Sequence, residues 1–147
     1  MSQENVEIVR RWYAFLPDVA DVDAAEDQAI LDQAFRDYLD EEYEVRLPAD
    51  YPDYPEGEPV FRGRDGLLRF AAMLRDAWSE WRFEPERIID AGNCVVVFMR
   101  VLAKGRKSGL PIAQTSTQVV TIADGRLTST RVYRDQHEAL KAVGLGE

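Results

Sequence analysis

The second half of the chain alternates between strand-like apolar runs and short turn sequences. The runs cover residues 82–90, 94–103, 110–122 and 127–134. The segments between them are Ala-Gly-Asn, a basic glycine-containing stretch and Ala-Asp-Gly-Arg, all typical of hairpin turns. Because hairpins join neighbouring strands that run in opposite directions, the pattern predicts a four-stranded antiparallel meander.

Three amphipathic stripes precede this meander and predict three helices. The first repeats apolar residues at three- and four-residue steps from Val6 to Leu16 and ends at Pro17. The second extends over residues 23–40, and the third follows the turn-like segment 61–66. The apolar face of the third helix consists of Leu67, Phe70, Leu74, Ala77 and Trp78.

The remaining elements are shorter. Alternation of polar and apolar residues from Tyr43 to Leu47 predicts a half-buried strand. Residues 48–60 contain four prolines and two tyrosines, so they form a loop, either a flap over a cavity or a proline-stiffened connector. Asp135 and Glu138 have the spacing of a capping box, which predicts a short C-terminal helix.

Length and composition limit the class of protein. A chain of 147 residues has the usual size of one domain, so we expect a single domain over residues 1–147. Hydrophobic residues make up 46% and charged residues 31%, a balance that argues against disorder. The net charge of −9 repels a phosphate backbone, so we expect no nucleic-acid partner.

The sequence also indicates the compartment. Cys94 is the one cysteine, which excludes an internal disulfide. The N-terminus has neither the basic nor the apolar segment of a secretion signal. The longest apolar run, Cys94 to Met99, is well short of the roughly 20 residues that a membrane helix requires. We therefore expect a cytoplasmic protein with no membrane partner.

Acidic residues are dense over residues 18–27 and 37–44. These segments lack the Asp-x-Asp-x-Asp-Gly loop and closing Glu of calcium sites, and we interpret them as a solvated helical face. A single histidine and scattered carboxylates show no metal-ligand spacing, so we expect no metal site. No motif implies a cofactor.

The strand over residues 94–103 is apolar on both faces. Val95, Val97, Met99 and Val101 point to one side, and Val96, Phe98 and Leu102 point to the other. A sheet covered by helices on one side normally has a polar opposite face. Two explanations are open. Either the second face packs on another copy in a homodimer, or the sheet wraps so tightly that both faces are internal.

Several local sequences resemble one superfamily. They are Val6–Arg11 with an aromatic at position 13, Gly63–Gly66, Arg82–Glu86 and Arg131–Asp135. They are similar to the SnoaL-like branch of the nuclear transport factor 2-like and ketosteroid isomerase-like superfamily. The resemblance implies an α+β fold in which a curved antiparallel sheet forms a cone around three N-terminal helices, with a short C-terminal helix. It says less about chemistry, because members include isomerases, polyketide cyclases, dehydratases and epoxide hydrolases.

The resemblance also implies positions for an isomerase-like site. Tyr13 corresponds to the phenol that donates a hydrogen bond to the developing oxyanion. Leu47 stands where the isomerases have their general-base aspartate, and Gln118 stands where they have a neutral carboxylic acid. Tyr13 and Gln118 are therefore the candidate oxyanion donors, whereas proton abstraction next to a carbonyl lacks its base.

The same correspondence predicts a pocket with an apolar, aromatic body and a few polar groups, as in small-molecule sites. The predicted lining residues are Trp12, Tyr13, Tyr38, Leu47, Phe70, Trp78, Val97, Met99, Val101, Gln114, Ser116, Gln118, Val132 and Arg134. Arg134 either points inward to an acidic ligand or partner, or outward as a surface cation. The lone histidine, His137, is expected on the last helix as a surface or packing residue.

Two hypotheses of function follow. The first is a cofactor-free isomerase, cyclase or dehydratase that acts on a polyketide-like or cyclic carbonyl compound held in a small apolar pocket. The second is a non-catalytic ligand-binding or protein-interaction module of the same fold. An open cavity that contains an ionisable group favours an enzyme, and a cone filled by side chains favours an interaction module.

Overall fold

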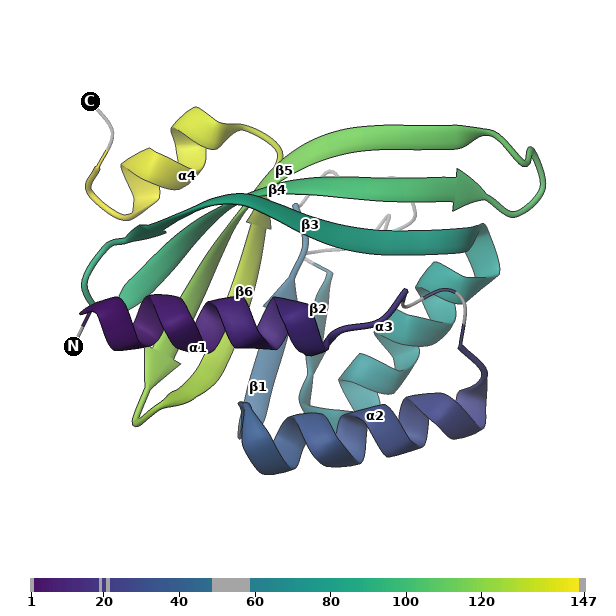
Figure 1. The fold of residues 1–147 in the computed structure, drawn as a ribbon, viewed down its shortest axis with the longest axis horizontal. Coiled ribbons are helices and arrows are strands. Elements are labelled where there is room, and N and C mark those ends of the chain that lie inside the picture. The colour runs from purple at the N-terminus through teal and green to yellow at the C-terminus, as the bar shows by residue number, and fades with distance from the viewer. Residues whose placement is uncertain (1, 19, 21, 49–58, 146–147) are drawn as a thin grey trace.

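The computed structural model describes residues 2–18, 20, 22–48 and 59–145. Figure 1 shows the path of the chain. The elements, in order, are α1 (Ser2–Phe15), α2 (Ala24–Asp37), β1 (Leu39–Arg46), β2 (Val60–Arg62), α3 (Gly63–Ala77), β3 (Trp78–Asp90), β4 (Cys94–Gly105), β5 (Pro111–Ala123), β6 (Arg126–Tyr133) and α4 (Gln136–Ala142).

The strands form one six-stranded sheet in the order β2-β1-β6-β5-β4-β3. Strands β3 to β6 pair antiparallel through successive hairpins, as the sequence predicts. The β5–β6 turn shows why the local sequence decides this pairing. Asp124 and Gly125 both have positive φ, the conformation that a tight hairpin turn requires and that an Asp-Gly pair adopts readily.

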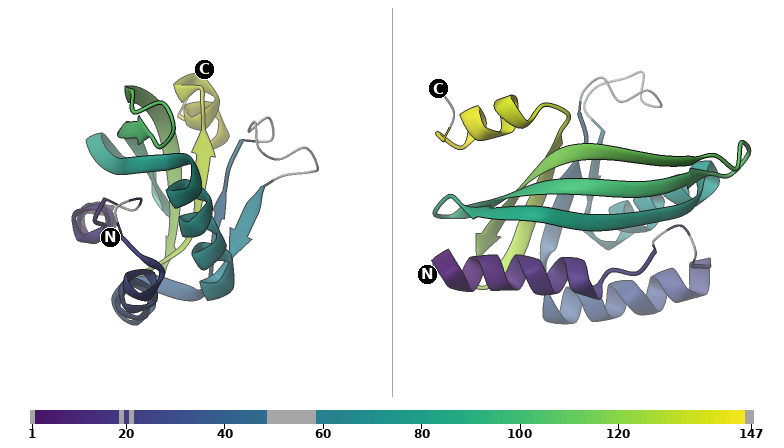
Figure 2. Two further views of the ribbon diagram at one scale, coloured as in Figure 1. Left: turned by 90° about the vertical axis from the view of Figure 1, so that its right-hand side faces the viewer. Right: turned by 45° about the horizontal axis from the view of Figure 1, so that its top comes forward.

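One ladder differs from the antiparallel expectation. Strand β1 pairs antiparallel with β2 but parallel with β6, so the sheet is mixed. No hairpin joins β1 to β6, since α3 and four strands intervene in the chain, and therefore no turn sequence fixes their relative direction. The predicted α+β class with a curved, cone-shaped sheet is confirmed, and Figure 2 shows the curvature of β3, β4 and β5.

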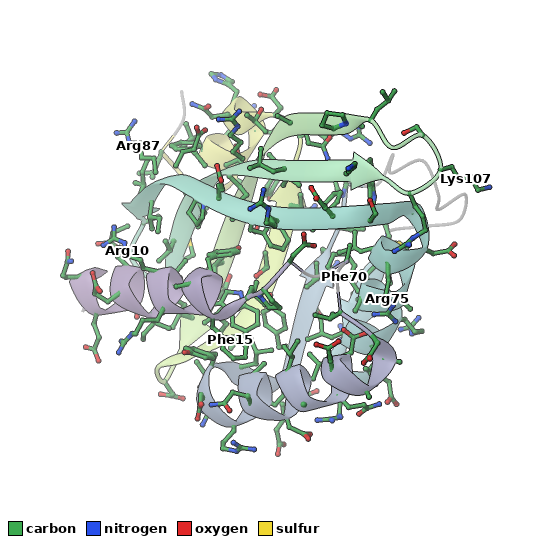
Figure 3. All side chains as sticks on the ribbon, turned by 45° about the vertical axis from the view of Figure 1, so that its right-hand side comes forward. Arg10, Phe15, Phe70, Arg75, Arg87 and Lys107 are labelled. Atoms are coloured by element: carbon green, nitrogen blue, oxygen red, sulfur yellow. The ribbon has the colours of Figure 1, made fainter. Side chains whose placement is uncertain are left out.

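The two faces of the sheet are covered differently. Helices α1, α2 and α3 lie on the concave side, where residues such as Val9, Ala34 and Leu74 join the main core. Figure 3 shows Phe15 between α1 and α2 and Phe70 extending from α3 toward the interior. Each fully buried valine, leucine or methionine in this core contributes roughly 1.5–3 kcal/mol.

Helix α4 packs on the outer face of the sheet. Its Ala139 is fully buried in a second cluster with Cys94, Val96 and Val119, and Phe98 packs against the same cluster. Part of the apolar outer face of β4 is therefore covered within the chain. The Asp135 carboxylate begins α4 by accepting a hydrogen bond from the backbone N–H of His137.

Two element boundaries differ from the sequence prediction. Helix α2 ends at Asp37 and β1 begins at Leu39, and Arg126 stabilises this boundary by donating hydrogen bonds to the carbonyl oxygens of Phe35, Arg36 and Leu39. Helix α3 ends at Ala77, and Trp78 belongs to β3 rather than to a helical face.

The predicted flap over residues 48–60 falls mostly outside the described residues. The described chain stops at Pro48 and resumes at Pro59, whose carbonyl oxygen accepts a hydrogen bond from the backbone N–H of Leu47 at 3.0 Å. None of the helices in the described segments is long and apolar enough to cross a membrane.

Candidate functional site

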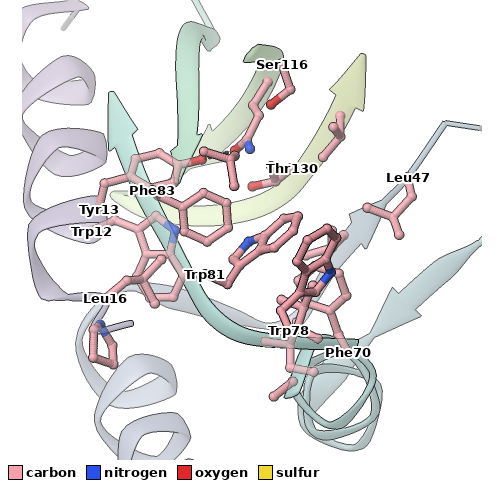
Figure 4. A pocket seen from close by; sticks show the side chains of 18 of the residues that line it. Trp12, Tyr13, Leu16, Leu47, Phe70, Trp78, Trp81, Phe83, Ser116 and Thr130 are labelled. Carbon is pink, nitrogen blue, oxygen red and sulfur yellow. Dashed lines mark hydrogen bonds between the residues drawn. The ribbon is translucent and has the colours of Figure 1, made fainter. Parts of the chain in front are cut away.

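A cavity of about 540 Å³ lies between the concave face of the sheet and the three N-terminal helices. Its wall is mostly apolar and includes several aromatic rings, and Figure 4 shows Trp81 between Phe83 and Trp78. The rings of Trp78 and Trp81 have centroids 5.3 Å apart, and Trp81 meets Phe83 edge to face. Rings held in this way by their neighbours form a firm apolar surface against which a flat molecule can stack.

Most of the residues predicted for the pocket do line this cavity. They are Trp12, Tyr13, Leu47, Phe70, Trp78, Val101, Gln114, Ser116, Gln118, Val132 and Arg134. Inward-facing positions on β4, β5 and β6 recur every second residue, which is why strand periodicity identifies them.

Tyr38, Val97 and Met99 are corrections to that set, because they do not line the cavity among the described residues. Val97 and Met99 share the inward face of β4 with Val101, but their side chains are only 0% and 1% exposed within the main core. Tyr38 packs on Trp12 and Phe15, with ring centroids 5.7 Å and 5.2 Å away. Strand parity fixes the face of a residue, but not where along that face the core ends and the cavity begins.

Tyr13 on α1 and Gln118 on β5 form a buried hydrogen bond in the cavity wall. The phenol donates to Oε1 of Gln118. Burial raises the pKa of Tyr13 well above its ordinary value, and the nearby Tyr43 adds to this shift. The phenol therefore stays protonated, and its O–H group is engaged in the hydrogen bond to Gln118. The amide nitrogen of Gln118 has no partner among the described residues, so its N–H groups remain available to a ligand.

A second neutral pair lies in the same wall. The hydroxyls of Tyr43 on β1 and Thr130 on β6 are 2.5 Å apart, and both side chains are buried. Burial raises the pKa of Tyr43, although the bond to Thr130 acts in the opposite direction. The sequence predicts Tyr43 on the half-buried strand over residues 43–47 but not in the pocket. Its parity with Leu47 in that predicted segment was the available clue, although β1 itself ends at Arg46.

Leu47 lies on the cavity wall and is 7% exposed. An apolar side chain therefore occupies the place where the family resemblance implies a general base. Among the described residues of the wall, Asp27 carries the only carboxylate. Asp27 is 6% exposed, and its Oδ2 accepts a hydrogen bond from the guanidinium of Arg75 on α3.

The burial of Asp27 corrects the interpretation of residues 18–27 as a solvated face. Asp27, Leu31 and Ala34 are the buried residues of α2. They are spaced at i, i+4 and i+7, the spacing of one helical face. An acidic residue in register with the apolar stripe was the signal that identified Asp27 as an inward-facing residue.

The orientation of Arg134 and the role of His137 were open from the sequence, and the structure places the two residues differently. Arg134 lines the cavity while its side chain is exposed, so it lies at the rim. His137 is exposed in the first turn of α4, away from the residues that line the cavity. Within the described residues no three His, Cys, Asp or Glu side chains form a group that could hold a metal ion.

An α+β cone with helices on its concave side and a cavity under them is the architecture of nuclear transport factor 2-like proteins. The model of the SnoaL-like domain matches residues 9–130, so the chain belongs to the SnoaL-like domain family. The resemblance drawn from the sequence is thereby confirmed.

Solved structures share this fold at low sequence identity. An NTF2-like protein of unknown function from Burkholderia pseudomallei K96243 is 18% identical, with a TM-score of 0.66 over 96% of this chain and 98% of that one. TerC, co-crystallised with polyporic acid, is 18% identical, with a TM-score of 0.67 over 95% and 98%. A protein from Jannaschia sp. CCS1 that carries the name of a SnoaL-like polyketide cyclase is 17% identical, with a TM-score of 0.65 over 99% and 95%. None of the curated proteins matches the chain.

Proposed function

We propose that the chain binds a small, mostly apolar cyclic compound that carries a carbonyl oxygen. The observation that carries the proposal is the aromatic cavity of about 540 Å³ with the amide of Gln118 in its wall. A cavity of this volume is within the usual range of small-molecule sites, which combine an apolar body with a few polar groups in this way. The co-crystallisation of the similarly folded TerC with polyporic acid supports a small-molecule ligand.

The electrostatics of the wall favour a neutral carbonyl over an anion. Both buried tyrosines have raised pKa values, so they stay protonated, and each is hydrogen-bonded to a neutral partner. The amide N–H of Gln118 donates to a carbonyl oxygen at modest cost, because it needs no proton transfer.

A second candidate function is catalysis within the same cavity. An amide N–H aimed at a carbonyl oxygen also stabilises the negative charge that develops there during isomerisation, cyclisation or dehydration. The polyketide cyclase name of one similarly folded protein supports this candidate. Leu47 favours ligand binding without catalysis, because its apolar side chain leaves the expected position of the general base without a proton acceptor.

The experiment compares two matched probes, 1-tetralone and tetralin, which differ by the carbonyl oxygen. Binding is followed by tryptophan fluorescence and by calorimetry. We expect 1-tetralone to bind about five- to tenfold more tightly than tetralin, the size of one net hydrogen bond. The variant Tyr13→Phe/Gln118→Leu removes both partners of the buried bond and abolishes that preference.

A matched control is Gln136→Leu, since Gln136 is exposed on α4 and away from the cavity. This variant keeps the preference for 1-tetralone. Binding of neither probe, or an unchanged preference in the double variant, contradicts the proposal.

We also propose that two copies pair through the part of the outer sheet face that α4 leaves uncovered. Leu102 lies on that face, and Arg100 is opposite Glu84 in the β3–β4 ladder. A two-fold interface joins one patch to itself, so a patch with an apolar centre and both charge signs is self-complementary.

A further inference from the structure

The two carboxylate oxygens of Asp27 differ in their hydrogen-bond partners among the described residues. Oδ2 accepts the hydrogen bond from Arg75, while Oδ1 has no hydrogen-bond partner among the described residues. Asp27 lines the cavity and is only 6% exposed. A buried carboxylate in a cavity wall, with one oxygen that has no donor among the described residues, can accept a hydrogen bond from a ligand.

The ion pair is firmly placed. Asp27 lies in the first turn of α2, which begins with a capping box between Asp23 and Glu26. Arg75 also donates a hydrogen bond to the carbonyl oxygen of Val22 at 3.4 Å, and Figure 3 shows it beside α2 and α3. The carboxylate is therefore held in one orientation by two helices and the preceding segment.

A purely structural role leaves part of this geometry unexplained. Removing two charges from water is costly, and the cost is offset only when the remaining lone pairs are also hydrogen-bonded. In Asp27 the lone pairs of Oδ1 have no donor among the described residues. A ligand hydroxyl placed there supplies the missing donor.

We propose that Asp27 is a ligand-binding residue that accepts a hydrogen bond from a hydroxyl group at the α2–α3 end of the cavity. The inference rests on the proposed function and narrows its ligand class to cyclic hydroxy ketones. The carbonyl oxygen binds at Gln118, and the hydroxyl group binds at Asp27. A neutral hydroxyl fits better than an ammonium group, because Arg75 already balances the charge of Asp27 and a buried extra cation has no counter-charge there.

The test uses 6-hydroxy-1-tetralone and 6-methoxy-1-tetralone. The two share the ring and the carbonyl, but only the first has a donor at the far end. We expect the wild-type chain to bind the hydroxy probe about tenfold more tightly, as for one charge-assisted hydrogen bond. In Asp27→Asn the new amide turns its oxygen to Arg75 and its N–H groups to the cavity, so the preference falls to about twofold or less.

Asp32→Asn is the matched control, because Asp32 is on the same helix with a side chain 56% exposed and an ion pair of its own to Arg64. It keeps the tenfold preference. A crystal structure of the wild-type chain with 6-hydroxy-1-tetralone provides a test that needs no variant to fold. The inference predicts the hydroxyl within hydrogen-bond distance of the Asp27 carboxylate.

The outcomes separate the two proposals. Equal affinity for the hydroxy and methoxy probes in the wild type, or the hydroxyl bound elsewhere in the crystal, overturns the role of Asp27 and leaves the carbonyl site at Gln118 standing. An undiminished preference in Asp27→Asn also overturns it. Failure of every tetralone to bind overturns the proposed function, and the role of Asp27 with it.

Discussion

The phenol of Tyr13 on α1 donates its hydrogen bond to Gln118 on β5, a residue 105 positions later in the chain. This bond joins the first helix to the sheet. It also determines which of the two side chains has a hydrogen-bond donor left for the cavity. Since the phenolic proton is used by Gln118, the amide of Gln118 replaces Tyr13 as the donor to the cavity. The family resemblance implies both residues as donors, and their mutual bond leaves Gln118 as the one whose N–H groups have no partner among the described residues.

The Tyr13–Gln118 bond predicts a non-additive stability pattern. Gln118→Leu leaves the buried Tyr13 hydroxyl without a partner and costs about 1–3 kcal/mol. Tyr13→Phe/Gln118→Leu removes both partners and costs less than Gln118→Leu alone. Urea unfolding of the wild type, both single variants and the double variant measures the coupling. Additive free energies of unfolding are the result that contradicts the bond.

Glu44 predicts a change of stability with pH. Burial opposes ionisation of Glu44, but hydrogen bonds from Arg46 and Arg62 outweigh it and lower its pKa below the ordinary value of 4.5. A carboxyl with a lowered folded-state pKa contributes stability that is fully present above the unfolded pKa and is lost as pH falls through the folded pKa.

Glu44→Gln therefore lowers the free energy of unfolding at pH 7 by about 1 kcal/mol and flattens its dependence on pH below 4.5. Glu42→Gln, on the same strand with an exposed side chain, keeps the wild-type slope. The measurement is urea unfolding at a series of pH values from neutral to acid. Parallel curves for wild type and Glu44→Gln speak against this role.

The hairpin strands of this fold are predictable from sequence because their determinants are local. The Asp124–Gly125 turn and the alternation of the β5 residues act over a few positions, and they locate Gln114, Ser116 and Gln118 on the inward face without further information. The features that the local sequence does not predict depend on contacts with residues far away in the chain. The parallel pairing of β1 with β6 depends on where α2 and α3 direct the chain, and no turn residue encodes it.

The site was predictable to the same extent. The alternation of side chains along a strand predicts which strand residues face the cavity. Where the cavity ends along β4 depends instead on how far core side chains pack around Met99. Asp27 was missed because its acidic neighbours suggested a solvated face. Only its ion pair with Arg75, 48 residues later, allows that charge to be buried.

Arg106 predicts a stability effect at the end of α3. From the β4–β5 turn its guanidinium donates to the carbonyl oxygens of Arg75 at 2.7 Å and Trp78 at 3.0 Å. A cation at a helix C-terminus satisfies carbonyls that have no partner within the helix and interacts favourably with the helix dipole. Arg106→Ala is expected to cost about 1 kcal/mol in thermal or urea unfolding, and Lys107→Ala, an exposed neighbour, less than about 0.5 kcal/mol. Equal losses in the two variants mean that Arg106 acts only through general surface charge.

The proposed homodimer predicts a mass of about twice 16.8 kDa by light scattering at micromolar concentration. Leu102 is the apolar position to change, because its side chain points away from the cavity and lies opposite Arg82 in the ladder. Leu102→Lys places a third cation beside Arg82 and Arg100, and the two-fold axis brings a second such group against it, so the dimer dissociates. Ala72→Lys, exposed on α3 at the opposite, concave side of the sheet, adds the same charge away from this face and leaves the mass unchanged. A wild-type chain that stays monomeric at every concentration, or a dimer that persists in Leu102→Lys, shows that this face is not the interface.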